Sequence, residues 1–276
     1  MIIKKASGEE VEFSVDKLRA SLSRSGASKQ VIESILQEVK SHLFPGISTK
    51  RIYKLAFSLL KKEAKPSAAR YQLKNAIMEL GPSGFPFEKF IAALLKHHGY
   101  KTEVGIIVEG HCVSHEIDVV AEKDNLYIMI ECKYHNLPGN SSDVKIPLYI
   151  HSRFKDVELT WKKLPGHETK NHQGWVVTNT KFTDDAIQYG TCVGLHLIGW
   201  NYPSKTNIKM WIDDSGLYPL TCLTTLTRSE KHHLLESKIV LCKEIVTNPD
   251  VLNILSLTAV RRDHIIKEST QLCKTC

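Results

Sequence analysis

The chain has 276 residues, enough for two domains, and 42% of them are hydrophobic, which leaves material for a substantial core. No apolar run approaches about 18 residues, so we expect no transmembrane helix, and the first residues lack the apolar region of a signal peptide. The odd number of cysteines, 7, indicates reduced thiols in the cytoplasm and not a disulfide scaffold. The formal net charge of +7 suits a phosphate-rich partner.

Residues 1–82 are interpreted as a small mixed domain. Two strand-like segments, Ile2–Lys5 and Val11–Phe13, flank a turn and predict a short hairpin. Ser14 is a predicted N-cap of the helix that follows. Apolar residues at helical spacing predict two further helices, over 28–43 and from Ser48 and Thr49 onward.

This order of a hairpin and then helices resembles the ATP-cone, the nucleotide-sensing domain of ribonucleotide reductase large subunits and of the repressor of their genes. The matching text is IKKASG from Ile3, FSVDKL from Phe13 and GIST from Gly46. The resemblance implies that ATP or dATP is a regulatory ligand and that Lys5, Lys17 and Thr49 touch its phosphates. Two ammonium groups and a helix-start hydroxyl form a reasonable anion site. The alternative is that both lysines are solvated surface charges.

Leu80–Pro86 is dense in Gly and Pro and is interpreted as a domain linker. An amphipathic helix is predicted next, from apolar residues at positions 87, 90, 91, 94 and 95. Glu88 lies at the edge of its apolar stripe. A Glu in the first turn is favoured by the helix dipole whether or not it has a further role.

Residues 115–122 and Leu126–Lys133 predict two strands joined by a turn at Asp124 and Asn125. Lys123 then faces Leu126, and the same antiparallel register places Asp118 opposite Glu131. Directly paired side chains have Cβ atoms about 4.5–5.5 Å apart on one face. Two carboxylates at that separation repel each other, and Mg²⁺ is a natural partner for them. Lys133 shares the face of Glu131, because side chains alternate along a strand.

The skeleton Asp118…Glu131-Cys132-Lys133 resembles the PD-(D/E)xK nuclease superfamily, and the surrounding text is most similar to Mrr-type restriction endonucleases. The resemblance implies catalytic roles for Asp118, Glu131 and Lys133, with support from Glu88. It also implies Mg²⁺, or Mn²⁺, bound by Asp118, Glu131 and the Cys132 carbonyl. The alternative is a surface hairpin in which Glu131 and Lys133 are a solvated pair.

Further strands are predicted at 174–178 and 195–200, with a helix capped by Thr183 between them. The fold class is therefore α/β: a restriction-endonuclease-like central mixed sheet flanked by helices, preceded by a mainly helical ATP-cone-like domain and followed by a helical C-terminal annex. Basic and polar side chains around this core are candidate DNA contacts. They are Lys162, Lys163, Lys181 and His135. Charged residues on a helix are also typical of a solvated face.

Three domains follow from these patterns: 1–82, ATP-cone-like; 83–220, Mrr-like nuclease; and 221–276, the annex. Turns in the annex faintly resemble helix-hairpin-helix DNA-binding turns, but Lys238 and Thr258 occupy the places where such turns need Gly. We predict a Mg²⁺-dependent DNA endonuclease of restriction or genome-defence type. It would act on double-stranded DNA, respond to ATP or dATP, form a homo-oligomer and be independent of membranes. The alternatives are a nucleotide-responsive, non-catalytic DNA-binding protein and an RNA nuclease that uses the same site.

Overall fold

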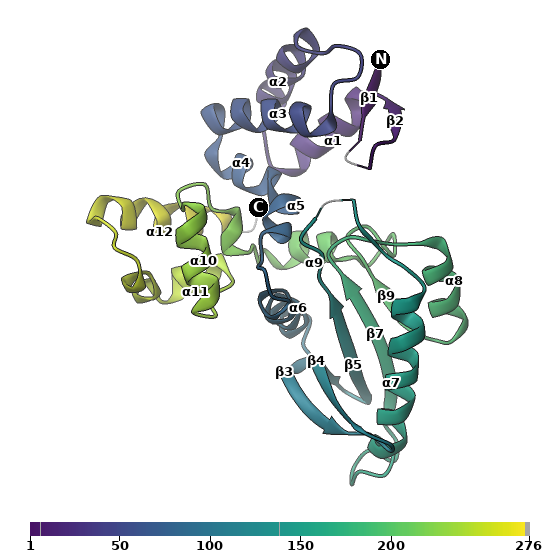
Figure 1. Cartoon of the computed structure of the whole chain (residues 1–276). Coiled ribbons are helices and arrows are strands. Elements are labelled where there is room, and N and C mark those ends of the chain that lie inside the picture. Colours follow the sequence, from purple (N-terminus) through teal and green to yellow (C-terminus); the bar gives the residue numbers. More distant parts are fainter. Residues whose placement is uncertain (6, 138, 274–276) are drawn as a thin grey trace. The chain divides into compact units, whose positions relative to one another are not determined.

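The chain folds into two compact units, shown in the computed structural model of Figure 1, which describes residues 1–5, 7–137 and 139–273. The first unit joins Met1–Glu79 to Tyr218–Cys276, and the second is Leu80–Leu217. The segment interpreted as a linker begins where the second unit begins. The N-terminal domain and the C-terminal annex, which the sequence analysis separated, thus belong to one unit. Ala6, within the IKKASG segment that carries the ATP-cone resemblance, lies outside the described residues.

The N-terminal part of the first unit has the predicted order of a hairpin followed by helices. Strands β1 (Ile2–Lys4) and β2 (Glu10–Glu12) pair antiparallel. Three helices follow, α1 (Val15–Arg24), α2 (Lys29–Ser41) and α3 (Thr49–Glu63). Each begins after a serine whose hydroxyl accepts a hydrogen bond from a backbone N–H three residues on, and these caps are Ser14, Ser28 and Ser48. The buried faces of the helices carry Leu22, Ile35, Val39, Ala56 and Leu60.

Two short helices, α4 (Lys65–Tyr71) and α5 (Leu73–Met78), connect this part to the C-terminal segment of the same unit. That segment contains η1 (Leu220–Cys222), α10 (Arg228–Glu236), α11 (Cys242–Thr247), η2 (Pro249–Ile254) and α12 (Ala259–Cys273). The hydroxyl of Thr221 donates to the Ala76 carbonyl at 2.7 Å. Buried Glu268 accepts four hydrogen bonds, from the backbone and hydroxyl groups of Thr224 and Thr225. A buried carboxylate is stable when its oxygens are bonded in this way.

Lys238 lies in the turn after α10 and has a left-handed backbone, with φ of +63°. A side chain at this φ brings its Cβ close to the following carbonyl oxygen, a conformation that only Gly adopts without strain. Lys238 is one of the two positions at which the helix-hairpin-helix resemblance would require Gly. Thr258 differs: its hydroxyl accepts a hydrogen bond from the Arg261 N–H at 3.4 Å.

We expect Lys238→Gly to raise the free energy of unfolding above that of Lys238→Ala by about 1 kcal/mol, because only Gly relieves the left-handed strain. Both variants lose the lysine side chain, so the comparison isolates the backbone. Urea denaturation of the two purified proteins measures the difference. Equal stability would contradict a strained turn.

The second unit is built on a mixed sheet in the order β3-β4-β5-β7-β9. Its strands are β3 (Lys101–Glu109), β4 (Ser114–Lys123), β5 (Leu126–Lys133), β7 (Asn171–Thr178) and β9 (His196–Ile198). The first three strands are antiparallel neighbours, and β7 and β9 run parallel to β5. A separate two-stranded ladder pairs β6 (Ser141–Ser142) with β8 (Lys181–Phe182). The predicted central mixed sheet flanked by helices is confirmed at this level.

Helices cover both faces of the sheet (Figure 1). On one face, α7 (Lys145–Trp161) and α8 (Asp184–Cys192) pack in a cluster that includes Met129, Phe154 and Val176. On the other, α6 (Phe85–His97) lies beside α9 (Ile208–Ser215), and Trp211 of α9 contacts Trp175 of β7. Residues Ile128, Met129 and Ile130 are fully buried, as expected for a strand covered on both faces.

The β4–β5 hairpin has the predicted two-residue turn and register. Its pairs run from Lys123↔Leu126 to Val119↔Ile130. Asp124 has a φ of +52°, which a short polar residue tolerates in a tight turn. Strand β3 was not predicted. Gly105, with a φ of +63°, lies where the pairing of β3 with β4 is interrupted, between the pairs Val104↔Val119 and Ile106↔Ile117.

No helix among the described residues is both long enough and apolar enough to span a membrane.

Candidate active site at the end of strand β5

The hairpin register brings Asp118 and Glu131 together. They follow the last regular pair, Val119↔Ile130, at the point where the two strands begin to separate. The Asp118 carboxylate turns into this gap, and its Oδ2 accepts a hydrogen bond from the Cys132 N–H at 2.7 Å. Because side chains alternate along β5, Glu131 and Lys133 lie on one face of the sheet and Cys132 lies on the other. Asp118 is thus tied to the backbone between Glu131 and Lys133.

Glu131 is paired with an arginine from helix α7. Arg153 Nη1 donates to Glu131 Oε2 at 2.6 Å, and its second amino group donates to the Glu116 carbonyl. The Arg153 guanidinium also lies 5.4 Å from the ring centroid of Tyr149. Both charged side chains are largely shielded, with 12% and 21% of their surface exposed. This ion pair was not predicted from the sequence, because Arg153 and Glu131 are 22 residues apart and meet only when α7 packs on the sheet.

Three carboxyl groups at this site have raised pKa values. Burial is the largest cause for Asp118 and Glu131, and the Asp118 charge raises the Glu131 pKa further. The Arg153 charge lowers both pKa values without cancelling the rise. Glu88 of α6 has its pKa raised to about 7, by burial first and then by Asp118, Glu116 and Glu131. Glu88 therefore shares an electrostatic environment with both predicted metal ligands.

Lys133 is half-buried, and its charge lowers the pKa values of Asp118 and Glu131. Within the described part of the chain its ammonium group forms no ion pair or hydrogen bond. Its backbone is fixed, since the hydroxyl of Thr178 donates to the Lys133 carbonyl at 2.8 Å. Lys133 thus brings an available ammonium group to a cluster of carboxylates.

Cys132 lies on the opposite face and is buried. Its thiol pKa is raised well above the usual value, by burial first and then by Asp118, Glu88 and Glu131. A neutral thiol is no ligand for a hard cation. Only its backbone carbonyl, the atom named in the sequence analysis, is relevant to Mg²⁺.

The donor set fits a hard divalent cation in its chemistry, because the carboxylates of Asp118, Glu131 and Glu88 are oxygen ligands that repel one another. Among the described residues, however, no group of three or more His, Cys, Asp and Glu side chains is close enough to hold a metal. The Arg153 guanidinium fills the role of counter-charge on Glu131. Ligation by Glu131 would require Arg153 to move or to share its carboxylate.

The predicted DNA contacts lie in different surroundings. His135 is half-buried, with its ring Nε2 3.0 Å from the Ser142 hydroxyl and its backbone bonded to the Asn179 side chain. Lys162 is exposed at the end of α7 and pairs with Glu158 at 2.9 Å. Lys163 and Lys181 are exposed. The pairing of Lys162 leaves it a weaker candidate for phosphate than the other two lysines.

The residues of the predicted nucleotide site lie on three segments of the first unit. Strand β1 forms a parallel bridge from Lys4 to Ser48, which sets the start of α3, and hence Thr49, beside the strand that leads to Lys5. Lys5 forms an exposed ion pair with Glu9 at 2.9 Å. Lys17 is exposed in the first turn of α1.

The second unit is thus an α/β sheet with a cluster of half-buried carboxylates and a lysine at the end of its central strand. Residues 218–273 match the family model described as AF1548-like, C-terminal. An uncharacterized protein of Archaeoglobus fulgidus is 37% identical over 183 residues, covering 66% of this chain and 99% of that relative. A solved structure described as a protein of unknown function, AF1548, is similar at 35% identity and a TM-score of 0.57, covering 69% of this chain and 98% of that one. The chain belongs to the AF1548-like family.

The raised pKa of Glu88 predicts a pH dependence of stability. A carboxyl with a higher pKa in the folded than in the unfolded state binds its proton more tightly when folded, so its effect on stability becomes unfavourable as pH rises from about 4.5 to about 7. We expect Glu88→Gln to match wild type near pH 4. Near pH 7.5 it should be more stable by about 1–2 kcal/mol, a figure reduced for the solvent screening of a half-buried group.

Urea unfolding across this pH range measures the effect. Glu103→Gln, at an exposed position on β3, is the matched control and should follow the wild-type curve. Parallel curves for wild type and Glu88→Gln would show that Glu88 has an ordinary pKa.

Proposed function

We propose that the second unit is a metal-dependent nuclease of the PD-(D/E)xK type that hydrolyses phosphodiester bonds in DNA. The observation that carries the proposal is the convergence of Asp118, Glu131 and Lys133 at the separating ends of β4 and β5. The two carboxylates retain raised pKa values despite Arg153, so the site has an unmet demand for positive charge. Mrr-like restriction or genome-defence activity is the finer form of this proposal.

Asp118 and Glu131 would hold Mg²⁺ or Mn²⁺, with the Cys132 carbonyl as a third ligand. Such an ion, when bound, supplies Lewis acidity to the phosphate and lowers the pKa of its water. The Lys133 ammonium would donate to the attacking water or to a phosphate oxygen as charge develops there. Glu88, with a pKa of about 7, is suited to take the proton of that water near neutral pH. A bond from phosphorus to the water oxygen would form as the bond from phosphorus to the leaving oxygen breaks, and that oxygen would take a proton from solvent.

Conversion of supercoiled plasmid to nicked and linear forms, with Mg²⁺ or Mn²⁺, tests the proposal. Asp118→Asn keeps an oxygen that can accept from the Cys132 N–H but removes the charge, and Lys133→Met keeps the aliphatic chain but removes the ammonium. Each should lower the cleavage rate at least about a hundredfold. Asp118→Asn should also weaken Mn²⁺ binding in calorimetry, whereas Lys133→Met should not, because an ammonium is no ligand.

Glu103→Gln is the matched control and should cleave as wild type does. Wild-type protein that cuts neither DNA nor RNA under any of these conditions contradicts the nuclease proposal. Cleavage of RNA alone would change the substrate to RNA while retaining the same site.

A specific observation favours a second candidate, a nucleotide-responsive protein that binds DNA without cutting it. Arg153 already supplies a positive charge to Glu131, one of the two carboxylates predicted to bind the metal ion. If this candidate is correct, Arg153→Met should not cleave DNA either. It should also lower the free energy of unfolding, because it leaves the largely shielded Glu131 carboxylate without its partner.

We propose further that the N-terminal part of the first unit binds ATP or dATP in the manner of an ATP-cone. The hairpin β1–β2, the Ser14 cap and the start of α3 beside β1 support the assignment. We also propose that the chain forms a homo-oligomer. The nucleotide would shift the equilibrium between two assembly or conformational states, which requires that it bind one of them more tightly than the other.

Calorimetry with the full chain is the test, because residues 1–79 form one unit with the C-terminal segment. We expect saturable heat with ATP or dATP. Lys17→Met should weaken binding about three- to tenfold, the range for a charge-assisted contact. Lys29→Met, at an exposed lysine that begins α2, is the matched control. Absence of heat at millimolar nucleotide would contradict the assignment.

A further inference from the structure

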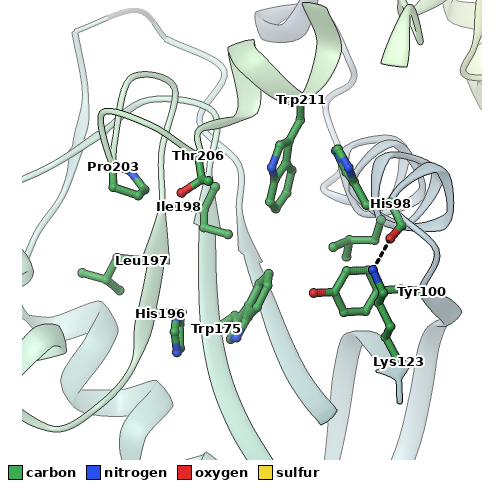
Figure 2. A pocket seen from close by; sticks show the side chains of 11 residues that line it. His98, Tyr100, Lys123, Trp175, His196, Leu197, Ile198, Pro203, Thr206 and Trp211 are labelled. Carbon is green, nitrogen blue, oxygen red and sulfur yellow. Dashed lines mark hydrogen bonds between the residues drawn. The ribbon is translucent and has the colours of Figure 1, made fainter. Parts of the chain in front are cut away.

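The second unit contains a pocket of about 350 Å³ that the proposed nuclease chemistry does not use. It lies between helix α6, helix α9 and the strands β7 and β9, as Figure 2 shows. Its volume falls in the range of small-ligand sites, about 300–1,000 Å³. Trp175 points into it and pairs in register with Ile130 of β5, one residue before Glu131. Because side chains alternate along β5, the pocket occupies the face of the sheet opposite the Glu131–Arg153 pair.

Flat aromatic rings form much of the pocket wall. The ring centroids of Trp175 and Trp211 are 6.5 Å apart, with planes inclined by 31°. Tyr100 meets Trp175 edge-on at 6.3 Å, and His98 lies 5.6 Å from Trp211. Trp211 is only half-buried, so part of its indole remains available to a ligand. Walls of this kind favour a planar ligand that stacks on an indole face.

Polar atoms also converge on the pocket. Tyr100 and Thr206 contribute hydroxyl groups to the lining, and Trp211 contributes an indole N–H. The set of donors and acceptors suits the edge of a heterocyclic base.

The charge at the pocket is positive. Lys123 lies on its wall, donates from Nζ to the His98 carbonyl at 2.9 Å and stands 5.3 Å from the Tyr100 ring centroid (Figure 2). It is exposed and has further N–H donors available. Burial, and then the His97 charge, lowers the pKa of His98, so Lys123 supplies the cation. No carboxylate is present among the described residues that line the pocket, although Asp124 and Asp214 interact with Tyr100 and His98 from outside that lining.

We propose that this pocket binds a nucleotide. Its base stacks on Trp211 and Trp175, its edge bonds to polar groups of the lining such as the Thr206 hydroxyl, and its phosphate meets the Lys123 ammonium. Aromatic cages also bind quaternary ammonium ions. The charged residue of this lining is the cation Lys123 and not a carboxylate, so a quaternary ammonium ligand would be repelled. The nucleotide is either free in solution or an unstacked unit of a single strand, and the chemistry recognised is the same. The inference does not depend on the nuclease proposal.

Tryptophan fluorescence is a suitable measurement, because all 4 tryptophans of the chain, at positions 161, 175, 200 and 211, lie in the second unit. A nucleotide bound to the first unit therefore cannot stack on a tryptophan, and stacking quenching reports on the second unit. We expect saturable quenching by at least one of AMP, GMP, CMP and dTMP, or by a single-stranded DNA tetramer. Binding of the monophosphate but not the tetramer identifies a free nucleotide as the ligand. Tighter binding of the tetramer identifies a strand.

Two variants locate the site. Trp211→Ala should weaken binding at least about tenfold, the loss associated with one stacking ring, with Trp175 retained as reporter. Thr206→Tyr, at an exposed position, should block the pocket mouth without removing a packed ring. Lys123→Met should weaken binding of the monophosphate but not of the matching nucleoside. Lys96→Met, at an exposed lysine of α6 outside the pocket, is the matched control and should bind as wild type does.

No quenching by any monophosphate or by the tetramer at millimolar concentration overturns the proposal. Quenching that persists unchanged in both Trp211→Ala and Thr206→Tyr also overturns it, because the nucleotide then binds elsewhere on the unit. Thermal melting of each variant establishes that it is folded before binding is compared.

Discussion

The two-residue turn at Asp124 and Asn125 is the constraint on which the second unit depends. A turn of this length fixes the antiparallel register, and a slip of one residue would move every side chain to the other face of the sheet. With the observed register, Ile128 and Ile130 enter the core while Glu131 reaches the end of the sheet beside Asp118. The parallel pairing of β5 with β7 then orders the strand end, since the Thr178 hydroxyl holds the Lys133 carbonyl. The two-residue turn at Asp124 and Asn125 therefore determines both which residues enter the core and where the carboxylates of the site lie.

The electrostatics of the site follow from burial. Asp118, Glu131 and Glu88 all have pKa values raised first by desolvation, and each is influenced by at least one other carboxylate. Protein folding brings them together only because other interactions offset the repulsion: the Cys132 N–H for Asp118 and the Arg153 guanidinium for Glu131. A site in this state responds to any added positive charge, whether a proton, a metal ion or a lysine.

Local rules predicted much of this fold. The caps at Ser14 and Ser48 and the register of the hairpin depend on a few neighbouring residues, and both agree with the structure. Long-range contacts were beyond the reach of such rules. The pairing of Arg153 with Glu131 needs the packing of α7, and the union of residues 1–79 with the C-terminal segment needs contacts such as Thr221 with Ala76. The aromatic pocket was missed for the same reason, because Tyr100, Trp175 and Trp211 come from three separate segments.

Side-chain alternation along β5 and β7 gives the second unit two chemically different faces. Toward α7, Glu131 and its arginine form a polar, ion-paired environment at the strand end. Toward α6 and α9, Ile130 and Trp175 stand side by side, and the aromatic wall continues through Tyr100 and Trp211. The adjacent residues Ile130 and Glu131 thus lie in an apolar and in a polar environment, respectively. A substitution at Glu131 and one at Trp175 should therefore act independently, because the fully buried layer of the sheet separates the groups they alter.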